Sequence, residues 1–256
     1  MIFDSHVHTT FSVDADTTIA EAVQTAKEKC VGLVITDHMD WDFPAPFPEF
    51  RVDLSGFFRE YAPLRSEKLL LGIELGLTAN SLAVVNEIAA SHDFDFVLGS
   101  VHVMDGREVD DTLYREKDER EVYRAYLLEA SMLLETADVD AFAHVDYPLR
   151  TTSAELPYAD YRVEFSALFD VLVRRNIVLE LNTSRLADQA ARSNLLAIYC
   201  AYRDCGGRYV TLGSDAHEHQ EIADNFTIAV DFLQEIGLIP VHFCKRKMLI
   251  DQQKMG

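Results

Sequence analysis

The chain has no long hydrophobic segment and no recognisable secretion signal. No run of about 18 or more apolar residues occurs among its 256 residues, so we expect no membrane-spanning helix. Its first residues, Met-Ile-Phe-Asp-Ser-His, include no basic stretch, apolar core or cleavage site. We therefore expect no signal peptide and a cytoplasmic location.

Cysteine and positive charge are also scarce. The four cysteines (Cys30, Cys200, Cys205 and Cys244) are scattered without a C-x-x-C pair, so we expect buried or partly buried free thiols in a reducing compartment. Lys and Arg number 23 against 43 Asp and Glu, and the net charge of −20 argues against nucleic-acid binding. Because bound divalent cations would reverse this charge locally, the composition is still compatible with a phosphate-ester substrate.

What the sequence does contain is a regular alternation of short apolar runs and helical segments. The runs are nearly continuous, as in strands buried on both faces of a parallel sheet. They span residues 2–8, 31–38, 69–75, 94–102, 141–146, 177–182 and 209–215. Helices are predicted from a capping box at Thr18 and Glu21 to about Lys29, and at residues 82–91, 119–136, 161–175, 193–204 and 222–236. Residues 40–55 and 104–117 are predicted to be long loops.

Strand–helix alternation implies parallel strands joined by right-handed crossovers. Six of the seven runs end in or next to His, Asp or Glu. An open sheet brings only a few strand ends together, whereas in a closed barrel all of them face one mouth. We therefore predict an α/β fold of the TIM-barrel type with seven strands. No repeat, low-complexity tract or linker interrupts the sequence, so residues 1–256 are predicted to form one domain.

The polar residues at these strand ends have the chemistry of metal ligands. In order, the ends read Asp4-Ser-His6-Val-His8, Thr36-Asp-His38, Gly72-Ile-Glu74, Ser100-Val-His102, Ala143-His144-Val-Asp146 and Ser214-Asp215-Ala-His217. Two residues apart, His6 and His8 share one face of a strand. A single histidine is more often a hydrogen-bonded core residue, but burying six at strand ends without an ion would be costly. Imidazole combined with carboxylate suits Zn²⁺, Fe²⁺ or Mn²⁺. The remaining histidines are expected outside the site: His92, His219 and His242.

Taken together, these motifs resemble the PHP (polymerase and histidinol phosphatase) superfamily over nearly the whole chain. The resemblance implies a distorted (β/α)7 barrel that holds three divalent metal ions. It implies three ligand groups: His6, His8, Glu74 and Asp215 for the first ion; Glu74, His102 and His144 for the second; and Asp14, His38 and His217 for the third. Some relatives have His in place of Asp14, and Asp16 is a rival for this position.

Other polar residues near the strand ends have two alternative interpretations. Asp37 and Asp146 either orient a metal-bound imidazole or cap a strand end. Arg150 and Arg185 are either surface residues or bidentate phosphate ligands, and the PHP resemblance implies basic residues that hold phosphate after the fifth and sixth strands. In catalysis, we expect Arg150 to stabilise transition-state charge, and Asp215 to orient the nucleophile or protonate the leaving alkoxide.

Three segments resemble the histidinol-phosphatase branch of the superfamily: Phe50-Arg-Val-Asp53, Glu180-Leu-Asn-Thr-Ser184 and Phe243-Cys-Lys-Arg-Lys247. Relatives often have Gly after Asn-Thr-Ser and Arg further on, whereas Arg185 follows directly here. The resemblance implies a metal-dependent phosphomonoesterase that hydrolyses L-histidinol phosphate in histidine biosynthesis. The ammonium and imidazole of this small-molecule substrate would meet acidic residues of the two long loops: Asp40, Asp42, Glu49, Asp105 and Asp110.

Three alternative functions stay open at this point. The same metal site could act on a phosphotyrosine peptide or a nucleotide. A C–N amidohydrolase could share the His-x-His barrel, but such enzymes often use a lysine at a strand end, and no predicted strand ends in Lys. A non-catalytic metal-binding module, as attached to some polymerases, is opposed by the complete ligand set. Nothing in the sequence indicates which metal binds or the oligomeric state.

Overall fold

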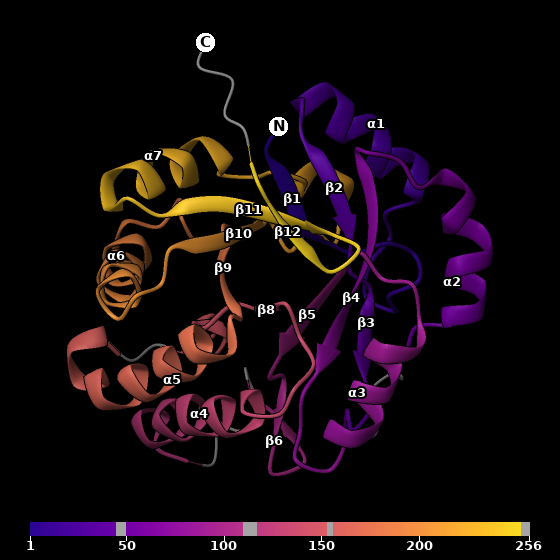
Figure 1. Cartoon of the computed structure of the whole chain (residues 1–256). Helices are drawn as coiled ribbons and strands as arrows, with labels where there is room; N and C mark the ends of the chain where they lie inside the picture. Colours follow the sequence, from indigo (N-terminus) through magenta and orange to yellow (C-terminus); the bar gives the residue numbers. More distant parts are fainter. Residues whose placement is uncertain (45–49, 110–116, 153–155, 252–256) are drawn as a thin grey trace.

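The computed structural model describes residues 1–44, 50–109, 117–152 and 156–251 (Figure 1). Each of the seven predicted apolar runs contains a parallel strand. These strands are β1 (Phe3–Val7), β2 (Gly32–Ile35), β4 (Leu69–Gly76), β5 (Phe96–Ser100), β8 (Ala141–Phe142), β9 (Val178–Asn182) and β10 (Tyr209–Gly213). The helices are α1 (Ile19–Lys29), α2 (Leu54–Tyr61), α3 (Leu82–Ser91), α4 (Glu119–Leu134), α5 (Arg162–Arg175), α6 (Gln189–Asp204) and α7 (Phe226–Ile236).

Parallel hydrogen bonding links the seven strands in the order β1-β2-β4-β5-β8-β9-β10. Residues just beyond β10 also bond to β1, because the Asp215 amide donates to the His6 carbonyl (2.9 Å) and the His8 amide to the Ala216 carbonyl (2.9 Å). Figure 1 shows the helices on the outside of these strands. The chain is therefore an α/β fold with a mostly parallel sheet, in which the carboxyl ends of these seven strands lie on one side.

Successive strand residues pack on opposite sides of the sheet, as the two-residue period of a strand requires. On β2, Leu33 and Ile35 belong to the larger apolar core that the helices cover. Val34, between them, belongs to a smaller core on the other side, together with Phe96 and Phe243. Burial on both faces explains why these strands are continuous apolar runs in the sequence.

Several short elements were not expected from the sequence. They are β3 (His38–Asp40), the hairpin of β6 (Val103–Met104) and β7 (Arg107–Glu108), the hairpin of β11 (Ile239–Cys244) and β12 (Lys247–Ile250), helix α2, and the 3₁₀ turns Ala62–Leu64, Tyr147–Leu149, Tyr158–Asp160 and His219–Glu221. The predicted loops 40–55 and 104–117 therefore contain regular structure at their ends. Most of these elements have only two to four residues, too few for a periodic pattern to be visible in the sequence. Strand β11, with six residues, and helix α2, with eight, were missed despite being longer.

Helix boundaries differ from the prediction where capping residues act. The capping box of Thr18 and Glu21 is present, and α1 ends at Cys30 in a left-handed conformation. Helix α6 begins at Gln189, earlier than predicted, because the Asp188 side chain accepts a hydrogen bond from the Ala191 amide. The predicted helix 222–236 begins only at Phe226, since the residues just before it adopt positive φ angles.

The C-terminal hairpin crosses the amino ends of the strands (Figure 1). The Phe243 ring lies 5.4 Å from that of Phe96, and the Arg246 guanidinium pairs with Asp140 directly before β8 (Nε–Oδ2 2.5 Å). The tip residues Lys245 and Arg246 both have positive φ, and the Arg246 amide donates to the Asp95 carbonyl (2.9 Å). The segment from Phe243 to Lys247 thus covers the end of the strands opposite to the histidines.

All four cysteines are free thiols, as expected. The expectation of burial was wrong for Cys30 and Cys205, which are exposed, and right for Cys200 and Cys244, which are half-buried. Both exposed cysteines follow the last turn of a helix, where side chains commonly reach the surface. None of the helices in the described ranges combines the length and hydrophobicity needed to cross a bilayer.

Candidate metal centre

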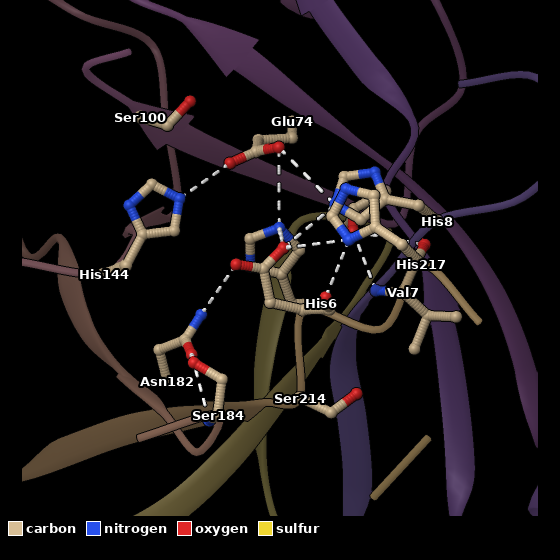
Figure 2. Close-up of polar contacts among 12 residues, drawn as sticks. His6, Val7, His8, Glu74, Ser100, His144, Asn182, Ser184, Ser214 and His217 are labelled. Carbon is tan, nitrogen blue, oxygen red and sulfur yellow. Dashed lines mark hydrogen bonds and ion pairs between the residues drawn. The ribbon is translucent and has the colours of Figure 1, made fainter. Parts of the chain in front are cut away.

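Glu74 is the third residue from the end of β4 and is buried. It lies among the histidines that the strand ends bring together (Figure 2). Its carboxylate oxygens face five imidazoles: Nε2 of His6 (3.5 Å), Nε2 of His8 (3.7 Å), Nδ1 of His38 (2.8 Å), Nε2 of His102 (3.3 Å) and Nε2 of His144 (3.1 Å). One carboxylate between so many nitrogen ligands has the position that a bridge between metal ions requires.

Four sets of three side chains offer ligand atoms that all lie within 4.8 Å of one another. They are His8, His38 and His217; His6, His8 and Glu74; His6, His144 and Asp215; and His38, Glu74 and His102. Eight of the nine predicted ligands belong to at least one set. The sets overlap, so the side chains form one continuous cluster.

Asp14 contacts the same cluster from the loop after β1. Its Oδ2 lies 3.2 Å from Nε2 of His217 and 3.5 Å from Nε2 of His38. No ion pair joins Asp16 to these histidines among the described contacts. The side chains of Asp14 and His217 are 36% and 30% exposed, whereas Glu74 and His6 are fully buried. This is therefore the side of the cluster that is open to solvent.

The unpaired atoms of the cluster fit divalent metal ions. The buried atoms Nε2 of His6, Nε2 of His8, Nδ1 of His38 and Oε2 of Glu74 have no hydrogen-bond partner in the described structure. Burying such atoms without a partner is costly, and metal ions bound between them would satisfy them. The mixture of imidazole and carboxylate donors is that of zinc, iron and manganese sites.

Comparison with known proteins agrees with this geometry. A family model described as PHP domain matches residues 4–184. A probable histidinol-phosphatase from Clostridium acetobutylicum is 36% identical over 253 residues, which cover 97% of this chain and 99% of that protein. This chain belongs to the PHP family.

A curated sequence and a crystal structure from Lactococcus lactis also match. A histidinol-phosphatase is 29% identical over 233 residues, covering 84% of this chain and 83% of that protein. A crystal structure of histidinol phosphate phosphatase, complexed with zinc, L-histidinol and phosphate, superposes with a TM-score of 0.88 at 26% identity. It covers 98% of this chain and 99% of that one. The Clostridium acetobutylicum protein and the crystal structure match 97% and 98% of this chain, so both extend into the part beyond residue 184 that carries Asp215 and His217.

In this PHP chain, the second ring nitrogen of several ligand candidates is held by a neighbour. Nδ1 of His6 bonds to Glu180 (2.7 Å), and Nδ1 of His102 to Asp40 (2.8 Å). Such partners fix the tautomer and the orientation of a metal-binding imidazole. We did not expect this role for Glu180 or Asp40. The signal in the sequence was a carboxylate inside an apolar run for Glu180, and one two residues beyond a histidine for Asp40.

The two aspartates for which alternatives were open have different surroundings. The Asp37 carboxylate accepts hydrogen bonds from the Thr9 amide (2.7 Å) and the Ser12 hydroxyl (2.8 Å), and Ser12 contacts Nδ1 of His8 (3.2 Å). Asp37 therefore contacts the predicted metal ligand His8 indirectly, through the Ser12 hydroxyl. Asp146 pairs with Arg185 instead (Nη1–Oδ2 2.8 Å), so the interpretation that it orients His144 was wrong.

Charges in the metal-free site stabilise each other. Burial favours the neutral form of Glu74, but His6, His102 and His38 outweigh it and hold the pKa of Glu74 well below its usual range. Burial likewise opposes protonation of His102, yet Asp40 and Glu74 raise its pKa to about 10. Metal ions would therefore displace protons from the imidazoles when they bind.

Arg150 reaches the cluster, and Arg185 lies one ion pair away. The Arg150 Nη2 donates to Oδ2 of Asp215 (2.5 Å), and its guanidinium lies over the Tyr147 ring (5.1 Å). Its Nε is buried without a hydrogen-bond partner. Arg185 is held by Asp146, which is not a predicted ligand. Both side chains are about one-quarter exposed, at 25% and 27%, so both remain accessible to a ligand.

The acidic loop residues that were expected to meet the substrate are mostly engaged by other parts of the protein. Asp40 is buried against His102, so the expectation that it meets the substrate was wrong. Asp42 accepts from the Thr78 hydroxyl (2.6 Å), and Asp105 pairs with Lys117 at the exposed hairpin. Glu49 and Asp110 lie outside the described residues.

The three remaining histidines lie among other partners, as expected. His92 stacks on Phe58 (5.6 Å), His219 contacts the Thr25 hydroxyl (3.2 Å), and His242 stacks on Phe3 (3.9 Å).

Proposed function

We propose that this chain is a metal-dependent phosphomonoesterase that hydrolyses L-histidinol phosphate to L-histidinol and phosphate, in histidine biosynthesis. The observation that carries the proposal is the pairing of Arg150 with Asp215, a member of the metal-ligand cluster. A guanidinium can bind the oxygens of a phosphoryl group from one side while metal ions bind them from the other, and this site places a guanidinium next to the ligand cluster. The histidinol-phosphatase names of the full-length relatives support the choice of substrate.

We assign three divalent ions, Zn²⁺, Fe²⁺ or Mn²⁺, to the cluster. The ligands would be His6, His8, Glu74 and Asp215; Glu74, His102 and His144; and Asp14, His38 and His217. When bound, such ions activate water at neutral pH and neutralise charge on the phosphoryl oxygens. The unpaired nitrogens of the cluster and the zinc in the Lactococcus lactis structure support this assignment.

The roles of the protein side chains follow from their contacts. Arg150, with donors left over from its bond to Asp215, binds the phosphoryl oxygens and stabilises the charge that develops on them. Arg185 is a second substrate-binding candidate. Burial favours a neutral Asp215, but His6 and Arg150 outweigh it and keep the pKa of Asp215 well below its usual range. A carboxylate with a lowered pKa accepts protons poorly but orients a water well, so we assign Asp215 to orient the nucleophile.

We further propose that the sheet closes into a distorted (β/α)7 barrel and that residues 1–256 form one domain. The bridge between Val7 and Ala216 and the two adjoining backbone hydrogen bonds support closure between β10 and β1. Ligands contributed by strands from β1 to β10 support a single mouth.

The decisive experiment measures phosphate release from L-histidinol phosphate beside phosphotyrosine and nucleoside monophosphates, on protein reconstituted with Mn²⁺, Zn²⁺ or Fe²⁺. We expect a strong preference for L-histidinol phosphate. Comparable slow turnover of all substrates would refute the substrate assignment and leave a general phosphoesterase. Amide or C–N hydrolysis without phosphate release would refute the class. We do not expect it, because no parallel strand in the described part of the chain ends in the lysine that such enzymes often use.

A further inference from the structure

Glu180 is a fully buried carboxylate in the middle of β9, and both of its oxygens contact the metal-ligand segments. Oε1 bonds to Nδ1 of His6 (2.7 Å). Oε2 accepts from the backbone amide of His144 (2.9 Å) and from the side-chain amide of Asn182 (3.3 Å). One side chain thus holds two predicted ligands that come from different strands.

The position of Glu180 explains how it reaches both. Strand β9 pairs with β8, which leads to His144, and with β10, whose end is hydrogen-bonded to β1 at His6. The hydroxyl of Tyr199, in α6, donates to the backbone carbonyl of Glu180. The carboxylate is therefore anchored at its own backbone and directed toward the cluster.

A glycine on the neighbouring strand leaves the space that this contact needs. A Cβ atom at Gly213 would lie 2.4 Å from Oε1 of Glu180 and 2.5 Å from Cβ of His6. Both distances are shorter than van der Waals contact allows, so any side chain at this position would separate the two residues. Space, and not backbone conformation, is the reason for glycine here.

With Nδ1 engaged by Glu180, the other ring nitrogen of His6 faces the cluster. His6 Nε2 lies 3.3 Å from Oδ1 of Asp215 and 3.5 Å from Oε2 of Glu74. A carboxylate on one nitrogen of an imidazole fixes its tautomer and strengthens the other nitrogen as a metal ligand.

We propose that Glu180 is a positioning residue of the metal centre, which directs Nε2 of His6 and fixes the backbone of His144 so that both imidazoles bind metal together. The inference rests on the metal centre of the proposed function, and is independent of the substrate. Removal of such a partner typically weakens metal binding by about 10- to 100-fold.

The test titrates metal-free protein with Zn²⁺ against a chromophoric chelator. Glu180→Gln keeps the size of the side chain, but its amide cannot accept from both His6 and His144. We expect zinc affinity to fall by about 10- to 100-fold. In NMR spectra of the zinc-loaded protein, the Nδ1–H proton of His6 should shift upfield, because its charged acceptor is lost. An affinity equal to that of the unchanged protein would overturn the proposal.

Asp95→Asn is the matched control. Asp95 is also buried, and it accepts from the Leu71 amide (3.0 Å) and the Lys245 amide (3.0 Å) at the opposite end of the strands. We expect it to lower stability but leave zinc affinity within about twofold, and an equal loss of affinity would assign the Glu180 effect to general destabilisation.

Gly213→Ala serves as the second variant if Glu180→Gln does not fold. It retains the carboxylate but pushes it away from His6, so unchanged zinc affinity would also overturn the proposal. A protein that binds zinc as predicted but does not hydrolyse L-histidinol phosphate would refute the proposed function alone. Failure of the unchanged protein to bind any of Zn²⁺, Mn²⁺ and Fe²⁺ would overturn both.

Discussion

Replacing Arg150 with alanine is the sharpest test of the phosphate site. The guanidinium donates to Asp215, is one-quarter exposed, and has a buried Nε without a hydrogen-bond partner. A hydrogen bond to a charged group contributes about 1.5–3 kcal/mol. At about 1.4 kcal/mol per factor of ten, Arg150→Ala should lower kcat/KM for a phosphate ester by about 10- to 150-fold.

The loss should appear chiefly as a higher KM, because Arg150 binds the phosphoryl group before it reacts as well as during the reaction. Steady-state phosphate release gives kcat and KM, and elemental analysis of the same samples gives the metal content. Metal content should be unchanged, since removal of the guanidinium leaves the Asp215 carboxylate free to bind metal. Arg150→Lys should recover only part of the loss because lysine lacks the planar fork.

Arg174→Ala is the control for a generic loss of positive charge. Arg174 lies in the last turn of α5, is 50% exposed and pairs with Glu135 and Asp170, neither of which is a predicted ligand. It should leave both kinetic constants unchanged. Unchanged kcat/KM in Arg150→Ala would refute the phosphate-binding role, and a parallel loss of metal would mean that Arg150 acts by holding Asp215.

Three other measurements test the metal centre and the core. His102→Ala should remove at least one ion and most activity; full metal content by elemental analysis would show that the second ion is misplaced. Chelation should abolish activity. Because the pKa of His102 without metal is raised to about 10, Mn²⁺ must displace a proton from it, and the Mn²⁺ affinity should increase as the pH is raised from about 7 to 9. An affinity that does not change with pH in calorimetry would contradict proton displacement. Phe96→Ala should cost about 3–5 kcal/mol in denaturant unfolding, because Phe96 is fully buried against Phe243.

The sequence was most informative about the parallel strands. Each strand is buried on both faces, so a continuous apolar run marks it, and all seven runs were found. The C-terminal hairpin was missed because residues 247–250 are exposed and therefore show neither a buried run nor a clear alternation. Its turn was also hidden, since Lys245 and Arg246 occupy positive-φ positions where glycine or asparagine is usual.

The ligand candidates could be predicted because histidine, aspartate and glutamate recur at the ends of the apolar runs. Their supporting residues were harder to recognise. Glu180 belongs to a run that looks like an ordinary buried strand, and Asp40 to a segment expected to be a loop. Whether a carboxylate there contacts solvent, substrate or an imidazole depends on strands far away in the sequence. His6 and Glu180 are 174 positions apart, and no local pattern encodes such a contact.

Buried carboxylates lie at both ends of these strands, and the two ends differ in how fully their buried polar atoms are hydrogen-bonded. At the amino ends, Asp95 and Asp140 accept from backbone amides, and Asp140 pairs with Arg246, so the carboxylates are satisfied by the protein itself. At the carboxyl ends, Oε2 of Glu74 and Nε2 of His6 are equally buried but have no hydrogen-bond partner. Since burial without a hydrogen bond is costly, bound cations would stabilise these atoms beyond the attraction that Glu74 already has to the surrounding imidazoles. The candidate chemistry therefore lies at the carboxyl ends, where buried ligand atoms have no hydrogen-bond partner, and not at the amino ends that the hairpin covers.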